Sequence, residues 1–308
     1  MTLSVVRNGL WYSSPAGTTQ GFSHFFSKSG MTYPNMRLGN KSHRLLPPGG
    51  KWDTPHAMGK IVVFANQKGG VGKTTTAVNL GAYLAEAGKR VLLVDFDPQS
   101  NTTSSVGASK DQPGIYELIM GKASAEAAIQ SCSVPNLFII ASSIDLTGAS
   151  VELVNEKERE YFLKRSLAPL AGSYDYLFID CPPSLGLLTL NGLVAADFVI
   201  IPLQCEYFAL EGLSLLLKTV NRVQKALNKE LKIGGILFTM YDTRTRLAHD
   251  VVQEVTDYFK EKVFRTIIPR NVRLSEAPSF AKPINQYDPE CIGARSYQKL
   301  AEEVLLNV

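Results

Sequence analysis

The sequence predicts an α/β fold in which helices cover both faces of a mostly parallel, twisted sheet. Three observations predict it: short apolar runs rich in β-branched residues recur along the chain, segments with helical spacing separate them, and glycine or proline marks many boundaries. Strands that alternate with helices form parallel sheets, because each crossover helix returns the chain to the same edge. The composition agrees, since 45% apolar and 19% charged residues are ordinary for a globular domain.

Residues 1–57 differ from the rest of the chain in composition and charge. They are rich in Ser, Gly, Pro and Thr, lack a helical or strand period, and carry six basic residues against one acid. We interpret them as a disordered or loosely attached basic extension. Three alternatives stay open: a tail that touches nucleic acid, a targeting segment, or a non-native start, which we favour. Residues 58–308 are then expected to form a single domain.

The elements expected after residue 58 have the lengths typical of such domains. Strand-like apolar runs occur at Ile61–Ala65, Arg90–Val94, Leu137–Ala141, Tyr174–Ile179, Phe198–Pro202, Lys232–Phe238 and Val263–Ile267. Helical spacing covers Thr74–Ala87, Val151–Leu167, Leu187–Ala195, Leu210–Leu227, Ala248–Lys260 and Gly293–Leu306. Ligands of such sheets bind at the carboxyl ends of the strands, so the loops that follow the strands are the candidate sites.

A glycine-rich loop lies between the first expected strand and the helix after it. This strand, loop and helix form the context of a P-loop, whose backbone N–H groups and helix N-terminus bind phosphate oxygens. Lys73 is placed to reach the β- and γ-phosphates, and the Thr74 hydroxyl to bind Mg²⁺. The general motif requires glycine at position 67, where this chain has Gln67. We expect ATP and Mg²⁺ as cofactors, with nucleotide contacts from Gly69, Gly70, Val71, Gly72, Lys73, Thr74 and Thr75.

Three acids follow two further strands. Asp95 and Asp97 stand at i and i+2 of an extended segment, so their carboxylates share one side, although an acidic turn is the simpler alternative. Asp180 ends an apolar run that looks like a Walker B strand, and two prolines after it take the chain out of the sheet. A carboxylate at this place holds Mg²⁺ through water, because Mg²⁺ keeps several of its waters.

The loop also carries a lysine ahead of its glycines, Lys68. Residues 68–74 therefore resemble the deviant P-loop of the ParA/MinD superfamily. The likeness to its chromosomal ParA proteins of the Soj type covers essentially 58–308 and includes 66–76, 94–101, 180–190, 201–213 and 268–283. The segments 202–212 and 269–278 are especially distinctive. The resemblance implies a P-loop ATPase, cytoplasmic and nucleoid-associated, that hydrolyses ATP slowly with Mg²⁺.

The resemblance also implies roles for single residues. Lys68 reaches the nucleotide of a second subunit, and Asp97 positions and activates the attacking water, so that Lys68, Lys73 and Asp97 form the catalytic set. Asp95 supports the Mg²⁺ shell, which gives Thr74, Asp95 and Asp180 as the metal set.

Partners follow from the same likeness. ATP produces a sandwich homodimer, the dimer binds DNA without sequence preference, and a ParB (Spo0J-like) centromere-binding protein stimulates hydrolysis. Arg244 and Arg273 match the arginines that the family uses on DNA. For either arginine, a solvated surface charge is the simpler interpretation.

Other functions within the superfamily stay open. A MinD-like membrane ATPase would end in a basic amphipathic helix, whereas residues 300–308 are short and acidic, so no membrane partner is expected. A catalytic relative with an iron–sulfur cluster would need suitably placed cysteines, and the four cysteines form no C-x-x-C pair. A ParA-like regulator of replication or transcription has the same motifs and is not separated from partitioning by the sequence.

Overall fold

The computed structural model describes residues 3–7, 10–14, 59–206 and 208–306. The chain divides into two units, residues 1–43 and 44–308. In the first unit, strands β1 (Leu3–Arg7) and β2 (Leu10–Ser14) pair antiparallel. Most of the extension expected at 1–57 lies outside the described residues, so its interpretation stays a prediction.

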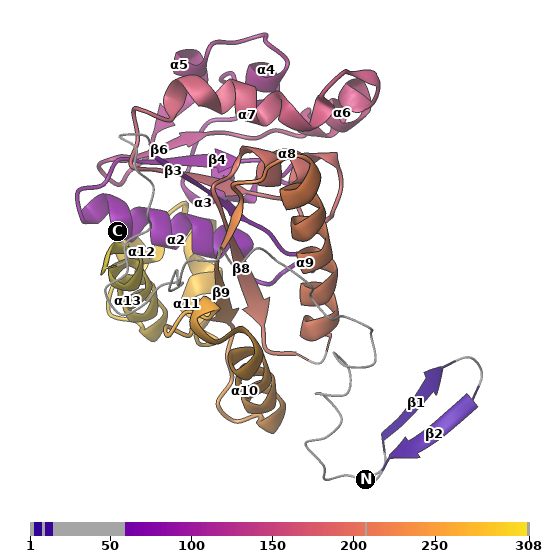
Figure 1. Cartoon of the computed structure of the whole chain (residues 1–308). Helices are drawn as coiled ribbons and strands as arrows, with labels where there is room; N and C mark the ends of the chain where they lie inside the picture. The colour runs from indigo at the N-terminus through magenta and orange to yellow at the C-terminus, as the bar shows by residue number, and fades with distance from the viewer. Residues whose placement is uncertain (1–2, 8–9, 15–58, 207, 307–308) are drawn as a thin grey trace. The chain divides into compact units, whose positions relative to one another are not determined.

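The larger unit is built on a seven-stranded sheet with the order β5-β6-β4-β7-β3-β8-β9 (Figure 1). Its strands in chain order are β3 (Lys60–Phe64), β4 (Val91–Asp95), β5 (Ile129–Ser131), β6 (Leu137–Ile140), β7 (Tyr176–Asp180), β8 (Phe198–Gln204) and β9 (Lys232–Thr239). Neighbouring strands are parallel except β5 and β6, which pair antiparallel at the edge. The predicted α/β fold with a mostly parallel sheet is confirmed.

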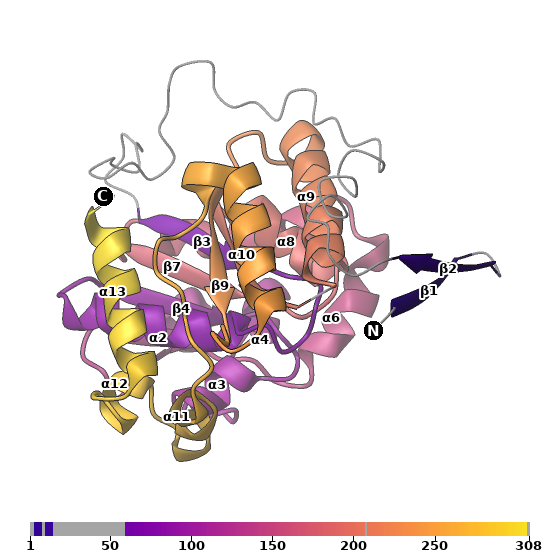
Figure 2. The same ribbon diagram turned by 90° about the horizontal axis from the view of Figure 1, so that it is seen from below.

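Helices lie on both sides of the sheet, as predicted. Figure 2 shows α2 and α13 on one side of the strands and α8 and α9 on the other. None of the helices in the described residues is long and apolar enough to cross a membrane. The helices are α2 (Lys73–Glu86), α3 (Asn101–Ser105), α4 (Ile115–Ile119), α5 (Ala125–Ala128), α6 (Leu146–Glu152), α7 (Phe162–Leu167), α8 (Leu187–Ala195), α9 (Ala209–Ala226), α10 (Arg246–Phe259), α11 (Val272–Glu276), α12 (Ile284–Tyr287) and α13 (Ile292–Leu306).

The two central strands β4 and β7 are buried along their whole length. Because helices cover both faces of β4 and β7, the sequences of these strands are continuous apolar runs rather than alternating patterns. The Phe64 ring on β3 meets the Phe178 ring of β7 edge to face, with 5.1 Å between centroids. Each central strand nevertheless ends in a buried acid, Asp95 or Asp180, and the two are register partners across the sheet. The fold therefore places two acids side by side at one edge.

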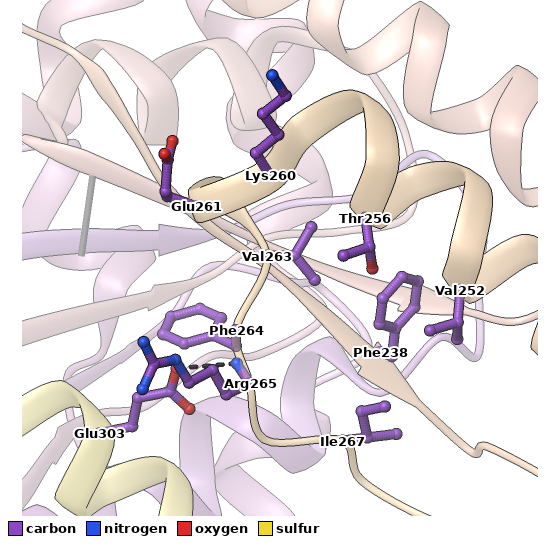
Figure 3. A pocket seen from close by; sticks show the side chains of 10 residues that line it. All are labelled: Phe238, Val252, Thr256, Lys260, Glu261, Val263, Phe264, Arg265, Ile267 and Glu303. Atoms are coloured by element: carbon purple, nitrogen blue, oxygen red, sulfur yellow. Dashed lines mark hydrogen bonds between the residues drawn. The ribbon is translucent and has the colours of Figure 1, made fainter. Parts of the chain in front are cut away.

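The strand predicted at Val263–Ile267 is wrong. Val263 makes one isolated bridge to Ile236, and the backbone N–H of Arg265 donates to the Glu303 carboxylate on α13 at 2.9 Å (Figure 3). The Thr266 N–H donates to the same carboxylate at 3.0 Å. Because a side chain takes these donors, the segment forms no continuous ladder with β9. It instead lines a pocket of about 450 Å³ together with β9, α10 and α13.

The helix predicted over Val151–Leu167 is also wrong as a single element. Helix α6 ends at Glu152, Glu158 adopts a left-handed conformation with φ 54°, and α7 begins only at Phe162. The intervening stretch 156–160 is a run of charged residues with no apolar face to bury, so packing does not hold it helical. The helix predicted at Leu187–Ala195 is confirmed with the same bounds.

Candidate functional site

The P-loop joins the carboxyl end of β3 to α2. Gly70 and Gly72 have φ values of 70° and 86°, a left-handed conformation that glycine adopts without strain. A Cβ added to Gly70 would meet nothing within 4 Å, so the requirement for glycine there is one of backbone conformation. The Val71 carbonyl accepts a hydrogen bond from Thr239 Oγ1 at 2.8 Å, which fixes the loop to the end of β9. This geometry presents a helix N-terminus to the edge of the sheet, the arrangement that a phosphate site requires.

Lys73 is the first residue of α2 and is only 6% exposed. Its Nζ donates to the Lys68 carbonyl oxygen at 3.4 Å. Burial lowers the pKa of the Lys73 ammonium, and the charges of Asp180 and Asp97 partly oppose that effect. A desolvated ammonium with incomplete compensation favours an anionic ligand, and phosphate oxygens are such a ligand.

The Thr74 hydroxyl and Asp180 meet at the carboxyl end of β7. Thr74 Oγ1 donates to Asp180 Oδ2 at 2.6 Å, and Thr102 Oγ1 donates to the same oxygen at 2.8 Å. The other oxygen, Asp180 Oδ1, is buried and has no hydrogen-bond partner. Burial raises the pKa of the Asp180 carboxyl to about 6, and the two hydroxyl donors partly offset the rise. A buried carboxylate with a free oxygen beside a threonine hydroxyl fits Mg²⁺, which takes oxygen ligands.

Asp95 lies beside Asp180 but faces α3. Its Oδ2 accepts from the backbone N–H and the hydroxyl of Thr103 at 2.8 and 2.6 Å, and its Oδ1 accepts from the Asp97 N–H at 3.3 Å. Burial, with the charge of Asp180, raises the pKa of Asp95 to about 7. The side chain thus fixes the start of α3, and α3 in turn carries Thr102 to Asp180. A support role for Asp95 in the metal shell stays a prediction.

Asp97 is buried in the loop after β4. Its Oδ1 accepts from the Gln99 N–H at 3.0 Å, and its charge acts on both Lys73 and Asp180. The structure therefore brings Lys73, Asp97 and Asp180 into one electrostatic cluster at the carboxyl edge. Their neighbour Cys181 is fully buried, and burial raises the pKa of its thiol, so a thiolate is disfavoured there.

Lys68 lies in a different environment from Lys73. Its Nζ forms an ion pair with the Glu206 carboxylate in the loop between β8 and α9, and its side chain is 39% exposed. Sequence reasoning missed Glu206, and it also missed Thr102 and Thr103. The only signal for the two threonines was a run of hydroxyl residues directly after Asp97-Pro98-Gln99.

The two arginines expected on DNA lie on segments that the fold brings together: Arg244 lies in the loop between β9 and α10, and Arg273 is the second residue of α11. Tyr241 and Pro269 form an isolated bridge that joins the segment after β9 to the segment before α11. Arg244 donates through Nε and Nη2 to Asp242 at 2.9 and 2.7 Å. Arg273 pairs with carboxylates as well, with Glu276 at 2.9 Å and with Asp288 at 3.3 Å. The structure therefore supplies each arginine with an acid of its own chain.

Comparison with known proteins gives concordant matches. A family described as an AAA domain matches residues 59–233. The chromosome-partitioning ATPase Soj of Treponema pallidum is 63% identical over 248 residues, which cover 80% of this chain and 98% of that protein. The sporulation initiation inhibitor protein Soj of Bacillus subtilis is 56% identical over 252 residues, covering 81% of this chain and all of that protein.

A solved structure has the same fold. Cobyrinic acid a,c-diamide synthase from Mycobacterium smegmatis, with bound ADP and magnesium, matches with a TM-score of 0.71 and 41% identity, covering 80% of this chain and 94% of that one. The bound nucleotide and metal of that protein agree with the two ligands that the geometry here fits. The chain belongs to the ParA/MinD superfamily of P-loop ATPases, in its Soj branch.

Proposed function

We propose that the chain is a partitioning ATPase for chromosomes or plasmids that ATP switches between a free monomer and a DNA-bound homodimer. ATP with Mg²⁺ favours the dimer, the dimer binds DNA without sequence preference, and hydrolysis returns it to the monomer. The similarity to the chromosome-partitioning ATPase Soj of Treponema pallidum supports the partitioning role. A ParB-like (Spo0J-like) protein is the expected partner that accelerates the slow hydrolysis, in the cytoplasm at the nucleoid.

The observation that carries this proposal is that one loop holds two lysines in opposite environments. Lys73 is buried beside Asp180, whereas Lys68 extends to the surface and pairs with Glu206. The inner lysine is placed to contact phosphates within its own subunit, whereas the outer one is placed to reach the nucleotide of a second subunit. ATP can favour a dimer only through contacts that the monomer lacks, and Lys68 offers such a contact.

Within one subunit, the remaining residues divide the chemistry. The loop N–H groups and Lys73 bind the phosphates, and Thr74 with Asp180 would hold Mg²⁺, which supplies charge neutralisation when bound. Asp97, fixed by its hydrogen bond from the Gln99 N–H, orients the attacking water and accepts its proton.

DNA binding in this proposal uses Arg244 and Arg273, whose side chains are 82% and 53% exposed. Contacts to phosphate carry no sequence information, and a two-fold dimer doubles a modest basic patch. Binding should fall steeply as salt rises, because phosphate contacts release counterions.

Co-sedimentation with DNA in ATP, in ADP and without nucleotide tests the proposal, using wild type and Asp97→Ala. We expect the wild type to sediment with DNA only in ATP, and Asp97→Ala to remain bound after the wild type has hydrolysed its ATP and dissociated. Asp111→Ala, which removes an exposed acid from a neighbouring loop, is the matched control and should behave as wild type. DNA binding that ignores nucleotide would contradict the switch, and ATP-dependent sedimentation with liposomes instead of DNA would favour the membrane alternative.

A further inference from the structure

The Lys68–Glu206 ion pair joins two loops that lie far apart in the sequence. Lys68 belongs to the P-loop, and Glu206, which is 138 residues further on, precedes α9. Both side chains are partly exposed, at 39% and 47%, so the pair stands at the surface rather than in the core. A partly exposed pair can exchange partners when a stronger one arrives.

The backbone on each side of the pair is held in place. On the lysine side, the Lys68 N–H donates to Asn66 Oδ1 at 3.0 Å, and the buried Asn66 Nδ2 donates to the Pro202 carbonyl at 2.7 Å. This second bond ties the P-loop to β8, the strand that leads to Glu206. The two residues therefore meet as a result of the fold, and only the side chains need to move for the pair to open.

The Glu206 carboxylate is oriented as well. Gln204 Nε2 donates to Glu206 Oε1 at 2.5 Å, which leaves Oε2 for Lys68. The Glu206 carbonyl accepts from the Ala209 N–H at 3.0 Å, at the point where α9 begins. One carboxylate oxygen is thus taken by the chain itself, and the other is directed at the lysine.

We propose that Glu206 is a positioning residue for Lys68, holding its ammonium within the subunit until the triphosphate of a second subunit replaces the carboxylate. The inference rests on the proposed ATP-dependent dimer. A triphosphate presents several anionic oxygens, and a closing interface excludes water, so the contact between subunits is stronger than the exposed pair that it replaces. The exposed pair is weak enough to be exchanged, and it keeps Lys68 from folding back onto the phosphates of its own subunit.

In this proposal Glu206 raises the ATP concentration that dimerisation requires. Glu206→Gln keeps the shape of the side chain and removes the charge that competes with phosphate. We expect the ATP concentration at half-maximal dimerisation to fall by about two- to fivefold, the range that an exposed ion pair supports. The maximal hydrolysis rate per dimer should not change, because Glu206 no longer contacts Lys68 once the dimer has formed.

The experiment titrates ATP against the dimer fraction by light scattering, for wild type, Glu206→Gln and Glu211→Gln. Glu211 lies exposed in the first turn of α9, the helix that follows Glu206, so the control removes an equal charge nearby without touching Lys68. An equal shift in both variants would mean a general charge effect and would overturn the proposal. An unchanged or higher ATP requirement in Glu206→Gln alone would overturn it too.

ADP affinity of the monomer separates the remaining outcomes. It should be the same in wild type and Glu206→Gln, since ADP does not engage a second subunit in the proposed switch. A loss of ADP binding in Glu206→Gln would show that Glu206 holds the P-loop itself, and the positioning role would be rejected. If the wild type fails to dimerise at any ATP concentration, the proposed function fails.

Discussion

Two regions of the molecule pair cations with carboxylates, but at different depths. One is the carboxyl edge of the sheet around Lys73 and Asp180, here called the phosphate edge, and the other is the pair of segments that carry Arg244 and Arg273, here called the arginine segments. At the phosphate edge Lys73 and Asp180 are buried, and one oxygen of Asp180 has no partner. In the arginine segments Arg244 and Arg273 are exposed and already paired with Asp242, Glu276 and Asp288. The buried groups are incompletely satisfied without a ligand, whereas the exposed ones must give up a partner to bind one.

This difference predicts unequal sensitivity to mutation. A buried polar group that loses its partner carries the full cost of desolvation, while an exposed charge exchanges water and ions freely. Substitutions at the phosphate edge should therefore change function by orders of magnitude, and substitutions in the arginine segments by small factors.

The largest effect is expected for Asp97→Asn. The change removes the proposed proton acceptor but keeps an oxygen for the Gln99 N–H, so the loop after β4 should retain its conformation. We expect hydrolysis to fall by about 10²- to 10⁴-fold, the usual contribution of a general base, with nucleotide affinity nearly unchanged. Single-turnover hydrolysis and a fluorescent-nucleotide titration measure the two quantities. A loss of less than tenfold in hydrolysis would remove Asp97 from the chemistry.

Asp180→Asn should have the next largest effect, and it should depend on the metal. The amide keeps the shape of the side chain but loses the charge that Mg²⁺ requires, so we expect nucleotide affinity in Mg²⁺ to fall by about 10- to 100-fold. EDTA removes Mg²⁺, so the nucleotide affinity of the wild type should then fall to that of Asp180→Asn. Equal affinities in Mg²⁺ would place the metal elsewhere.

The strand, loop and helix at the phosphate edge could be placed from the sequence because their signals are local. A strand, a glycine-rich loop and a helix follow one another within residues 60–86, and Asp180 ends an apolar run. Two features depend instead on contacts between separate segments. Asp95 and Asp180 are 85 residues apart and become neighbours through the register of β4 and β7. Thr102 reaches Asp180 from α3, and no periodic pattern predicted this contact.

The failed strand prediction has the same origin. Val263–Ile267 has the β-branched composition of a strand, but Glu303 on α13 takes the backbone donors that a ladder would need. The carboxylates that face Lys68, Arg244 and Arg273 were likewise invisible as partners, because exposed acids are common and their spacing to a base is not fixed. Composition describes what a segment can form, and its neighbours in space decide what it does form.

A smaller effect is expected for Arg244→Ala and Arg273→Ala. Each removes one phosphate contact per subunit and leaves the ATP-dependent dimer intact, so DNA binding at low salt should weaken about three- to tenfold and its salt dependence should become shallower. The control is Arg295→Ala, which removes another exposed, ion-paired arginine, on α13. Unchanged DNA retention by both variants would reject the assignment of DNA binding to Arg244 and Arg273.

The smallest effect is expected for Asp242→Asn. Arg244 holds the pKa of Asp242 well below its usual range, so the acid is charged at any physiological pH and competes with phosphate for the guanidinium. Asparagine keeps an oxygen for the Arg244 N–H, so the turn persists while the competition ends. We expect DNA binding in ATP to strengthen by about two- to fivefold, the range of an exposed pair. Asp250→Asn, whose carboxylate lies 3.8 Å from Arg246, is the control for a general change in charge. Equal gains in both variants would assign the effect to net charge, and weaker binding in Asp242→Asn would mean that the acid orients Arg244 for DNA rather than withholding it.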